Sequence, residues 1–246
     1  MGMFDRLIPA LDMVGMEEPM PIVNALRNLV PVYKIHAWSD TWLSSAIDKL
    51  YAAGAVGVWA DYKLHDTPDT VAKRAAKIKS AGADWITVHA GGGPKMIEAA
   101  KKSGLYVIAV TLLTSLTDKM IKDLYHADPS DVVLLLAEWA REGGADALVC
   151  SPKQVGTLNH WRSGFDDLSW NTKLIVPGTR SAGADVNDQQ QVDTPYNAIL
   201  NGADYLVVGR QVTGSSDPLN AIQKIAEEIE PAIQHRMTEE TWRYEL

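Results

Sequence analysis

Three charged side chains stand close together in the segment WADYKLHDTPDT, residues 59–70. Asp61, Lys63 and Asp66 directly follow a run of apolar residues. Asp61 and Lys63 are two positions apart, so in a strand both side chains point to the same side. Carboxylates beside a lysine favour its charged form, and we therefore expect Lys63 to donate a proton and not to act as a neutral base. A structural ion pair is the alternative.

Two later segments carry the residue types that bind phosphate. VPGTRSAGADVNDQQQ (176–191) contains Arg180, and VVGRQ (207–211) contains Arg210. Backbone amides at glycines and arginine side chains together form sites for anions. The Gly- and Asp-rich stretch 181–188 is a candidate for a mobile lid over such a site. The alternative is a solvent-exposed loop, which explains Arg180 better than it explains Arg210.

Short apolar runs alternate with longer amphipathic stretches along the whole chain. Such continuous hydrophobicity is typical of parallel strands covered on both faces. The expected strands are residues 7–11, 32–35, 56–63, 85–90, 106–111, 147–150, 173–178 and 205–210, with helical patterns between them at 69–82, 131–144 and 218–234. Eight strands alternating with helices over 246 residues predict a single (β/α)8 barrel domain, residues 1–246. An open, doubly wound sheet is the alternative.

Boundary signals agree with this alternation. The motifs AGAD (81–84), GGAD (143–146) and NGAD (201–204) each lie between a helical pattern and an apolar run. Glycine there is expected to end the helix in a left-handed conformation and turn the chain into the next strand. Thr67 and Pro68 are typical of an N-cap followed by proline at the first helical position, so we expect a helix to begin there.

In a barrel of this kind the active site lies at the C-terminal ends of the strands. The polar residues at or just after the expected strand ends are Asp12, Lys34, Asp61, Lys63, His89, Thr114, Arg180 and Arg210. The pattern therefore predicts a site at that rim. A purely structural hydrogen bond is an equally good interpretation of His89.

Composition excludes several classes of function. The net charge of −8 and the pI near 5.2 disfavour a nucleic-acid partner. The single cysteine, Cys150, allows no internal disulfide and no multi-cysteine zinc cluster. The first residues lack the layout of a signal peptide, and no apolar run approaches the roughly 20 residues of a membrane span. These observations predict a cytoplasmic protein with no membrane partner.

Taken together, the motifs resemble those of the orotidine 5′-phosphate decarboxylase family. The resemblance covers the whole chain and centres on DYKLHDTPDT, which is similar to that family's Asp-x-Lys-x-x-Asp signature. The other motifs that carry it are ALD (10–12), YKI (33–35), TVHAGGG (87–93), TLLTS (111–115), PGTR (177–180), NDQ (187–189) and VVGR (207–210). Two positions depart from the family pattern: His36 stands where glycine is usual, and Thr67 where isoleucine is common.

The resemblance implies a decarboxylase of orotidine 5′-monophosphate that forms UMP and carbon dioxide in pyrimidine biosynthesis, without a metal or organic cofactor. It also implies a homodimer with shared active sites, in which Asp66 and Thr70 reach into the site of the neighbouring subunit.

Roles for single residues follow from the same resemblance. Lys63 would stabilise and then protonate a ring carbanion, and Asp61 would lie near the substrate carboxylate. Lys34 and Asp12 would contact the ribose, and Thr114 the pyrimidine. The residues implied in phosphate binding are Arg180, Gln189, Gly209 and Arg210.

Two other functions are alternatives. A magnesium-dependent decarboxylase of a keto-sugar phosphate in the same suite shares the motif, but it has an acidic metal ligand where Lys34 stands here. A lysine cannot ligate magnesium at neutral pH. A catalytically silent nucleotide-binding barrel is the second alternative, and it has little use for a lysine set between two acids.

Overall fold

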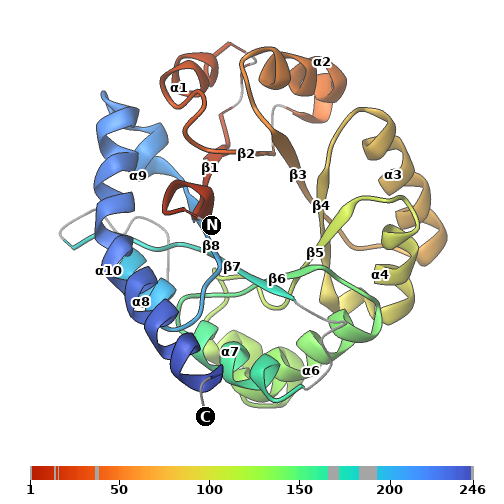
Figure 1. The fold of residues 1–246 in the computed structure, drawn as a ribbon. Coiled ribbons are helices and arrows are strands. Elements are labelled where there is room, and N and C mark those ends of the chain that lie inside the picture. The colour runs from red at the N-terminus through yellow and green to blue at the C-terminus, as the bar shows by residue number, and fades with distance from the viewer. Residues whose placement is uncertain are drawn as a thin grey trace.

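Eight parallel strands close into a barrel in the order in which they occur in the sequence (Figure 1). The computed structural model describes residues 2–13, 15, 17–36, 39–165, 172–182 and 193–244. The strands are β1 (Leu7–Leu11), β2 (Val32–Ile35), β3 (Gly57–Leu64), β4 (Trp85–His89), β5 (Tyr106–Val110), β6 (Ala147–Val149), β7 (Lys173–Pro177) and β8 (Tyr205–Val208). β8 pairs with β1 and closes the ring, so the predicted (β/α)8 barrel is confirmed.

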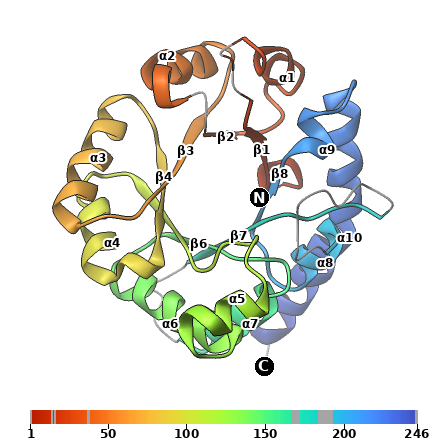
Figure 2. The same ribbon diagram turned by 180° about the vertical axis from the view of Figure 1, so that it is seen from behind.

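The helices form an outer ring around the strands (Figures 1 and 2). They are α1 (Met20–Ala25), α2 (Ser39–Ala52), α3 (Pro68–Ser80), α4 (Pro94–Lys101), α5 (Asp118–Tyr125), α6 (Pro129–Glu142), α7 (Val155–Ser163), α8 (Pro195–Leu200), α9 (Arg210–Thr213) and α10 (Pro218–Tyr244), with short 3-10 helices η1 (Phe4–Arg6) and η2 (Ala90–Gly92). Two helical patterns match α3 and α6 closely. The third is too short, because α10 continues past residue 234 to Tyr244. No described helix is both long and apolar enough to cross a membrane.

Side chains fill the inside of the barrel. Ile8, Val32, Ile108 and Ile175 belong to a buried cluster that also contains Trp59. Ring contacts continue this cluster through Trp85, Tyr106 and Tyr205: their centroids lie 4.9 Å apart for Trp85 and Tyr106, and 5.9 Å apart for Trp85 and Tyr205. These aromatic residues stand at the first position of β4, β5 and β8, so this end of the barrel is packed with side chains.

The repeated Gly-Ala-Asp motif does two things in the structure. Gly82, Gly144 and Gly202 have φ angles of 99°, 75° and 116°, which confirms the predicted left-handed turns. The aspartate that follows each glycine ties its strand to the preceding one. The backbone N–H groups of Val58, Val107 and Leu174 donate to the carboxylates of Asp84, Asp146 and Asp204 over 2.9, 2.7 and 2.9 Å, respectively.

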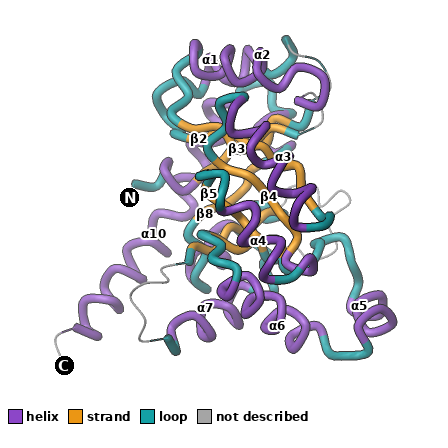
Figure 3. The backbone as a smooth tube through the Cα atoms, turned by 90° about the vertical axis from the view of Figure 1, so that its right-hand side faces the viewer, coloured by secondary structure: helices purple, strands orange, loops and turns teal. Residues whose placement is uncertain are grey.

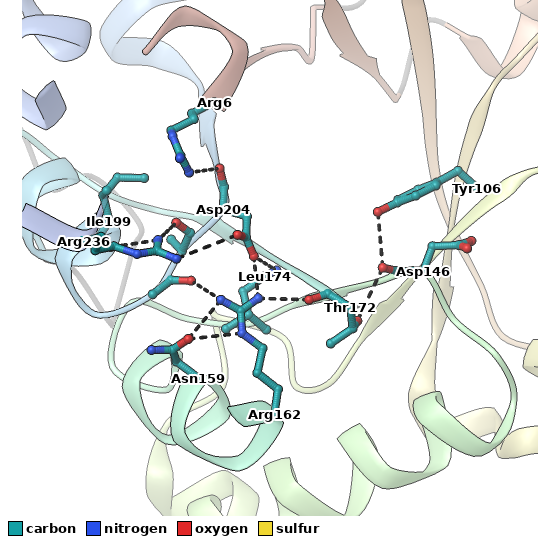
Figure 4. A network of polar contacts seen from close by, with 12 residues as sticks. Arg6, Tyr106, Asp146, Asn159, Arg162, Thr172, Leu174, Ile199, Asp204 and Arg236 are labelled. Carbon is teal, nitrogen blue, oxygen red and sulfur yellow. Dashed lines mark hydrogen bonds and ion pairs between the residues drawn. The ribbon is translucent and has the colours of Figure 1, made fainter. Parts of the chain in front are cut away.

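Asp204 is also the centre of a larger ion-pair network (Figure 4). Its Oδ2 lies 2.5 Å from Nη1 of Arg162, and its Oδ1 lies 4.0 Å from Nη2 of Arg236. Arg162 donates further to the backbone carbonyl groups of Thr172 and Gly202 over 2.9 and 2.8 Å. Because this network lies at the N-terminal ends of β7 and β8, its expected contribution is to stability and not to chemistry.

Candidate active site

A cavity of about 610 Å³ opens at the C-terminal ends of the strands. It is lined by Ala10, Asp12, Met13, Lys34, Trp59, Asp61, Lys63, Val110, Thr114, Val149, Pro177, Gly178, Arg180, Val207, Gly209, Arg210, Thr213 and Gly214. The rim residues predicted from the sequence are therefore brought together, except His89, which is not among the lining residues.

An alternating array of charges forms one wall of this cavity. Nζ of Lys34 lies 2.7 Å from Oδ1 of Asp12 and 3.1 Å from Oδ2 of Asp61. Nζ of Lys63 lies 2.7 Å from the same Oδ2 of Asp61. Within one chain, the array thus holds a carboxylate between two ammonium groups, whereas the sequence motif had indicated a lysine between two carboxylates.

The backbone of β3 departs from a regular strand at the array. Its register against β4 shifts between Ala60 and Leu64, and Lys63 adopts a φ of 49°. A left-handed conformation at a residue other than glycine costs about 1–3 kcal/mol, and such residues cluster at functional sites. Nδ1 of His36 lies 2.6 Å from the carbonyl oxygen of Asp61 and supports this irregular segment.

Burial and neighbouring charges act in opposite directions on the array. Burial by itself raises the pKa of Asp61, but the charges of Lys34 and Lys63 and hydrogen bonds from Lys63 and Thr87 hold that pKa below its ordinary value. Burial likewise lowers the pKa of Lys34, but the charges of Asp61 and Asp12 outweigh it and raise that pKa. Both groups are therefore charged at neutral pH.

Two buried residues that the sequence analysis missed support Asp61. Thr87 on β4 donates a hydrogen bond to Oδ1 of Asp61 over 2.7 Å, and Nε1 of Trp59 donates to Thr87 over 2.7 Å. Trp59 precedes Asp61 by two positions and so faces the same side of β3. That spacing was a usable signal for Trp59, whereas the contact with Thr87 depends on the register between β3 and β4.

Two arginines also line the cavity and follow β7 and β8. Arg180 is 8% exposed, whereas Arg210 at the start of α9 is exposed. The alternative of a solvent-exposed loop therefore does not account for Arg180, which is the more buried of the two arginines. Ser181 anchors the loop after β7: its hydroxyl accepts from Nε2 of Gln211 over 2.7 Å and donates to Oε2 of Glu228 on α10 over 2.5 Å.

Asp66 and Thr70 do not join the cavity of their own chain. Asp66 is exposed, and its Oδ1 accepts from the backbone N–H of Thr67 over 2.6 Å. The predicted helix start is confirmed, since Thr67 is the N-cap of α3 and Pro68 its first residue. The Thr67 hydroxyl makes no capping bond, however, and instead donates to the Thr70 hydroxyl over 3.1 Å.

His89 is placed beside the array without facing the cavity. Its ring centroid lies 5.3 Å from that of His65. Burial and the electrostatic influence of His65 and Lys63 lower the pKa of His89, and Asp61 only partly opposes them. Gln189 and most of the expected lid, from residue 183 onward, lie outside the described residues.

The arrangement suits a reaction that develops negative charge at one end of an anionic substrate. A fixed ammonium group at Lys63 faces the cavity, and the two arginines that also line it can hold an anionic group of the substrate. Within the described residues, no group of three or more His, Cys, Asp and Glu side chains is placed to hold a metal ion.

Comparisons with known proteins agree with this site. Residues 5–225 match the model of the "Orotidine 5'-phosphate decarboxylase / HUMPS family". A curated relative from Rhodopseudomonas palustris (strain BisA53), named orotidine 5'-phosphate decarboxylase, is 38% identical over 92% of this chain and 94% of its own length. A relative of the same name from Actinobacillus pleuropneumoniae serotype 5b (strain L20) is 34% identical over 91% of this chain and 98% of its own length.

Solved structures give the same result. The crystal structure of orotidine 5'-phosphate decarboxylase from Lactobacillus acidophilus is similar with a TM-score of 0.74 and 29% identity, covering 92% of this chain and 99% of that one. An uncharacterized conserved protein from Geobacillus kaustophilus is similar with a TM-score of 0.74 and 27% identity, covering 91% of this chain and 100% of that one. From its sequence, its fold and its charged cavity, the chain belongs to the orotidine 5'-phosphate decarboxylase / HUMPS family.

Proposed function

We propose that the protein decarboxylates orotidine 5′-monophosphate to UMP and carbon dioxide in pyrimidine biosynthesis. The observation that carries the proposal is the array of Asp12, Lys34, Asp61 and Lys63 on the wall of a cavity that two arginines also line. The named relatives at 34% and 38% identity support the same activity. The enzyme would be a carboxy-lyase.

Lys63 has two tasks in this proposal. When the bond between the ring and its carboxylate breaks, the electron pair stays on the ring carbon and no adjacent group can delocalise it. The ammonium group of Lys63 stabilises this developing charge and then transfers a proton to the same carbon. Solvent afterwards returns a proton to the neutral amine. The ion pair with Asp61, at 2.7 Å, keeps Nζ in one place while the substrate enters.

Asp61 would lie near the carboxylate that is lost. Asp61 is 5% exposed and stays ionised, so its charge repels a substrate carboxylate brought close to it. This repulsion is relieved as carbon dioxide leaves. Lys34, held between Asp12 and Asp61, balances the two acids and with Asp12 would contact the ribose.

The remaining lining residues would bind the parts of the substrate that do not react. Thr114 would contact the pyrimidine, and Arg180, Gly209 and Arg210 would hold the phosphate together with Gln189. Binding energy from the phosphate can then be used to organise the charged groups around the reacting carbon. This gives the arginines a catalytic effect although they act at a distance from the chemistry.

The charge array disfavours a magnesium-dependent reaction on a sugar phosphate. Such an enzyme needs oxygen ligands for the metal. Here the position beside Asp12 and Asp61 is taken by the ammonium group of Lys34, at 2.7 and 3.1 Å from their oxygens. We therefore propose a reaction that needs neither a metal nor an organic cofactor.

A homodimer with shared active sites completes the proposal. Asp66 and Thr70 follow the C-terminal end of β3 and lie outside the cavity of their own chain. Helix α5 follows the C-terminal end of β5 and projects from the body of the molecule (Figure 3). Its apolar side chains Met120, Leu124 and Tyr125 are 50%, 65% and 40% exposed. A second subunit docked against this rim would cover them and bring its Asp66 to the array.

An ultraviolet assay of orotidylate loss tests the proposal. Purified protein dialysed against EDTA should turn over orotidine 5′-monophosphate at an undiminished rate. A rate that is abolished by EDTA and restored by magnesium would favour the sugar-phosphate reaction. Tight binding of UMP with no turnover under either condition would instead indicate the silent nucleotide-binding barrel.

A further inference from the structure

Two consecutive hydrogen bonds lead from the interior of the barrel to the carboxylate of Asp61. Nε1 of Trp59 donates to Oγ1 of Thr87 over 2.7 Å, and that hydroxyl donates to Oδ1 of Asp61 over 2.7 Å. The three residues are 1%, 0% and 5% exposed, respectively. Water therefore has little access to these groups, and each depends on the others for its hydrogen bonds.

The direction of both hydrogen bonds is fixed by the chemistry of the two ends. An indole N–H group can only donate, and an ionised carboxylate can only accept. The hydroxyl of Thr87 must therefore accept from Trp59 and direct its single proton toward Asp61. Because the indole already occupies the accepting side of the hydroxyl, rotation of that proton away from Asp61 would lose a hydrogen bond without gaining one.

Thr87 takes the oxygen of Asp61 that the lysines leave open. Both ammonium groups contact Oδ2, whereas Thr87 contacts Oδ1. A carboxylate held at one oxygen alone can turn about its Cβ–Cγ bond, but a partner on each oxygen fixes its plane. The placement of Lys63 depends on this plane, because its Nζ is paired with Oδ2.

We propose that Thr87 is a positioning residue for the reaction and that Trp59 holds the Thr87 hydroxyl in its donating orientation. Thr87 acts through Asp61, since it does not itself line the cavity. The proposal rests on the function proposed above, because turnover of orotidine 5′-monophosphate is its readout. A role in positioning charges for the transition state changes kcat, whereas a contact made equally before and during the reaction changes KM.

Thr87→Val tests the proposal, because it removes the hydroxyl and keeps the shape of the side chain. Loss of a hydrogen bond to a charged group should lower kcat at least about tenfold. KM should stay within about threefold, because the residues that line the cavity are unchanged. Thr87→Ser keeps the hydroxyl and should restore most of kcat. The matched control is Thr172→Val. Thr172 is also buried, at 3% exposed, and its hydroxyl lies 3.4 Å from the carbonyl oxygen of Asp146. It precedes β7 and so lies at the opposite end of the barrel.

Trp59→Phe tests whether Trp59 orients the hydroxyl of Thr87. It keeps an aromatic side chain in the barrel, although a smaller one, and removes the N–H that orients Thr87. We expect a smaller loss of kcat than for Thr87→Val, and no further loss when the two substitutions are combined, because both act through one hydrogen bond. If Thr87→Val does not fold, an unchanged kcat in Trp59→Phe overturns the proposal.

Three results would contradict the inference. A kcat of Thr87→Val within about twofold of the unaltered protein would show that the hydroxyl does not position Asp61. A Thr87→Ser variant as slow as Thr87→Val would show that shape, and not the hydroxyl, matters. The unaltered protein is measured in the same assay, and its failure to turn over orotidylate would overturn the proposed function and this proposal with it.

Discussion

Nζ of Lys63 lies 2.7 Å from Oδ2 of Asp61, the same oxygen that Nζ of Lys34 approaches to 3.1 Å. One carboxylate oxygen therefore faces two ammonium groups, and Lys63 reaches this place through a left-handed backbone conformation with φ of 49°. A residue in a strained conformation persists only where its surroundings stabilise it. The ion pairs, Thr87 and the contact from His36 supply that support.

Arg210→Ala should weaken binding of UMP by about 1.5–3 kcal/mol, the usual value of a hydrogen bond to a charged group. Binding of the nucleoside uridine should hardly change, because it lacks the phosphate that Arg210 is proposed to contact. Calorimetric titration with both ligands measures the difference. Arg141→Ala is a suitable control, since Arg141 pairs with Glu138 on the outer helix α6. Equal losses of affinity for uridine and UMP would show that the phosphate assignment of Arg210 is wrong.

The contribution of Asp61 to the free energy of unfolding should decrease as pH falls into the acid range. The folded-state pKa of Asp61 is lowered, so its contribution is present above the unfolded value of about 3.9 and is lost as pH falls through the folded value. Asp61→Asn should therefore unfold more easily by roughly 3 kcal/mol at neutral pH, because it leaves two buried or half-buried cations with one partner fewer.

Urea unfolding of Asp61→Asn and the unaltered protein at a series of pH values measures this difference. It should be constant from about pH 5 to pH 9 and shrink below about pH 4. The raised pKa of Lys34 sets the upper end of this pH range. The contribution of Lys34 to stability is present below its unfolded pKa and is lost only as pH rises through its folded pKa. A difference that grows as pH falls would contradict the assigned charge states.

Asp204→Ala should lower stability without lowering turnover. The substitution leaves Arg162 without its carboxylate partner and the backbone N–H of Leu174 without an acceptor, at the end of the barrel away from the cavity. Loss of a partner in a buried ion pair costs about 3–5 kcal/mol. The control Asp69→Ala removes an exposed pair with Lys73 on α3 and should cost at most about 0.5 kcal/mol. A large loss of kcat in Asp204→Ala, measured well below its melting temperature, would contradict a purely structural role.

Mixing two inactive variants tests whether Asp66 acts across a dimer interface. In a heterodimer of Lys63→Ala and Asp66→Ala chains, one site carries both lesions and the other carries none. Two-fold symmetry requires this distribution if the second acid of each site comes from the partner. Refolding the two variants together should therefore restore one working site per heterodimer, measured as turnover.

The control for this experiment mixes Lys63→Ala with Lys34→Ala. Both lysines serve the site of their own chain, 3.1 and 2.7 Å from the same Asp61, so every site in that heterodimer carries a lesion and no activity should return. If confirmed heterodimers of Lys63→Ala and Asp66→Ala are as inactive as this control, the shared-site model is wrong.

The barrel was predictable because its strands are buried on both faces and read as apolar runs. Seven of the polar side chains at strand ends were found by the same reasoning, since parallel strands bring their C-terminal ends to one rim. What the sequence did not reveal depends on contacts between strands. The hydrogen bond from Thr87 to Asp61 follows from the register of β3 against β4, and that register shifts between Ala60 and Leu64.

The charges within the array show the same limit. The spacing of Asp61, Lys63 and Asp66 indicated a lysine between two acids. Within one chain, however, Asp66 does not pair with Lys63 and instead accepts a hydrogen bond from the backbone N–H of Thr67. The second partner in the array is instead Lys34, which pairs with Asp61 because β2 lies beside β3 with Lys34 opposite Trp59. A pattern along the chain cannot report which neighbouring strand supplies the partner.

The most direct test of the account is turnover by Lys63→Ala. If Lys63 stabilises the ring carbanion and protonates it, kcat for orotidine 5′-monophosphate in EDTA should fall at least about 1,000-fold. UMP should still bind, because the phosphate and ribose contacts come from other residues, and Lys73→Ala on the surface of α3 should be fully active. The ultraviolet assay and a UMP titration measure both quantities on the same protein. A Lys63→Ala variant that decarboxylates orotidylate as fast as the unaltered protein would contradict the central claim.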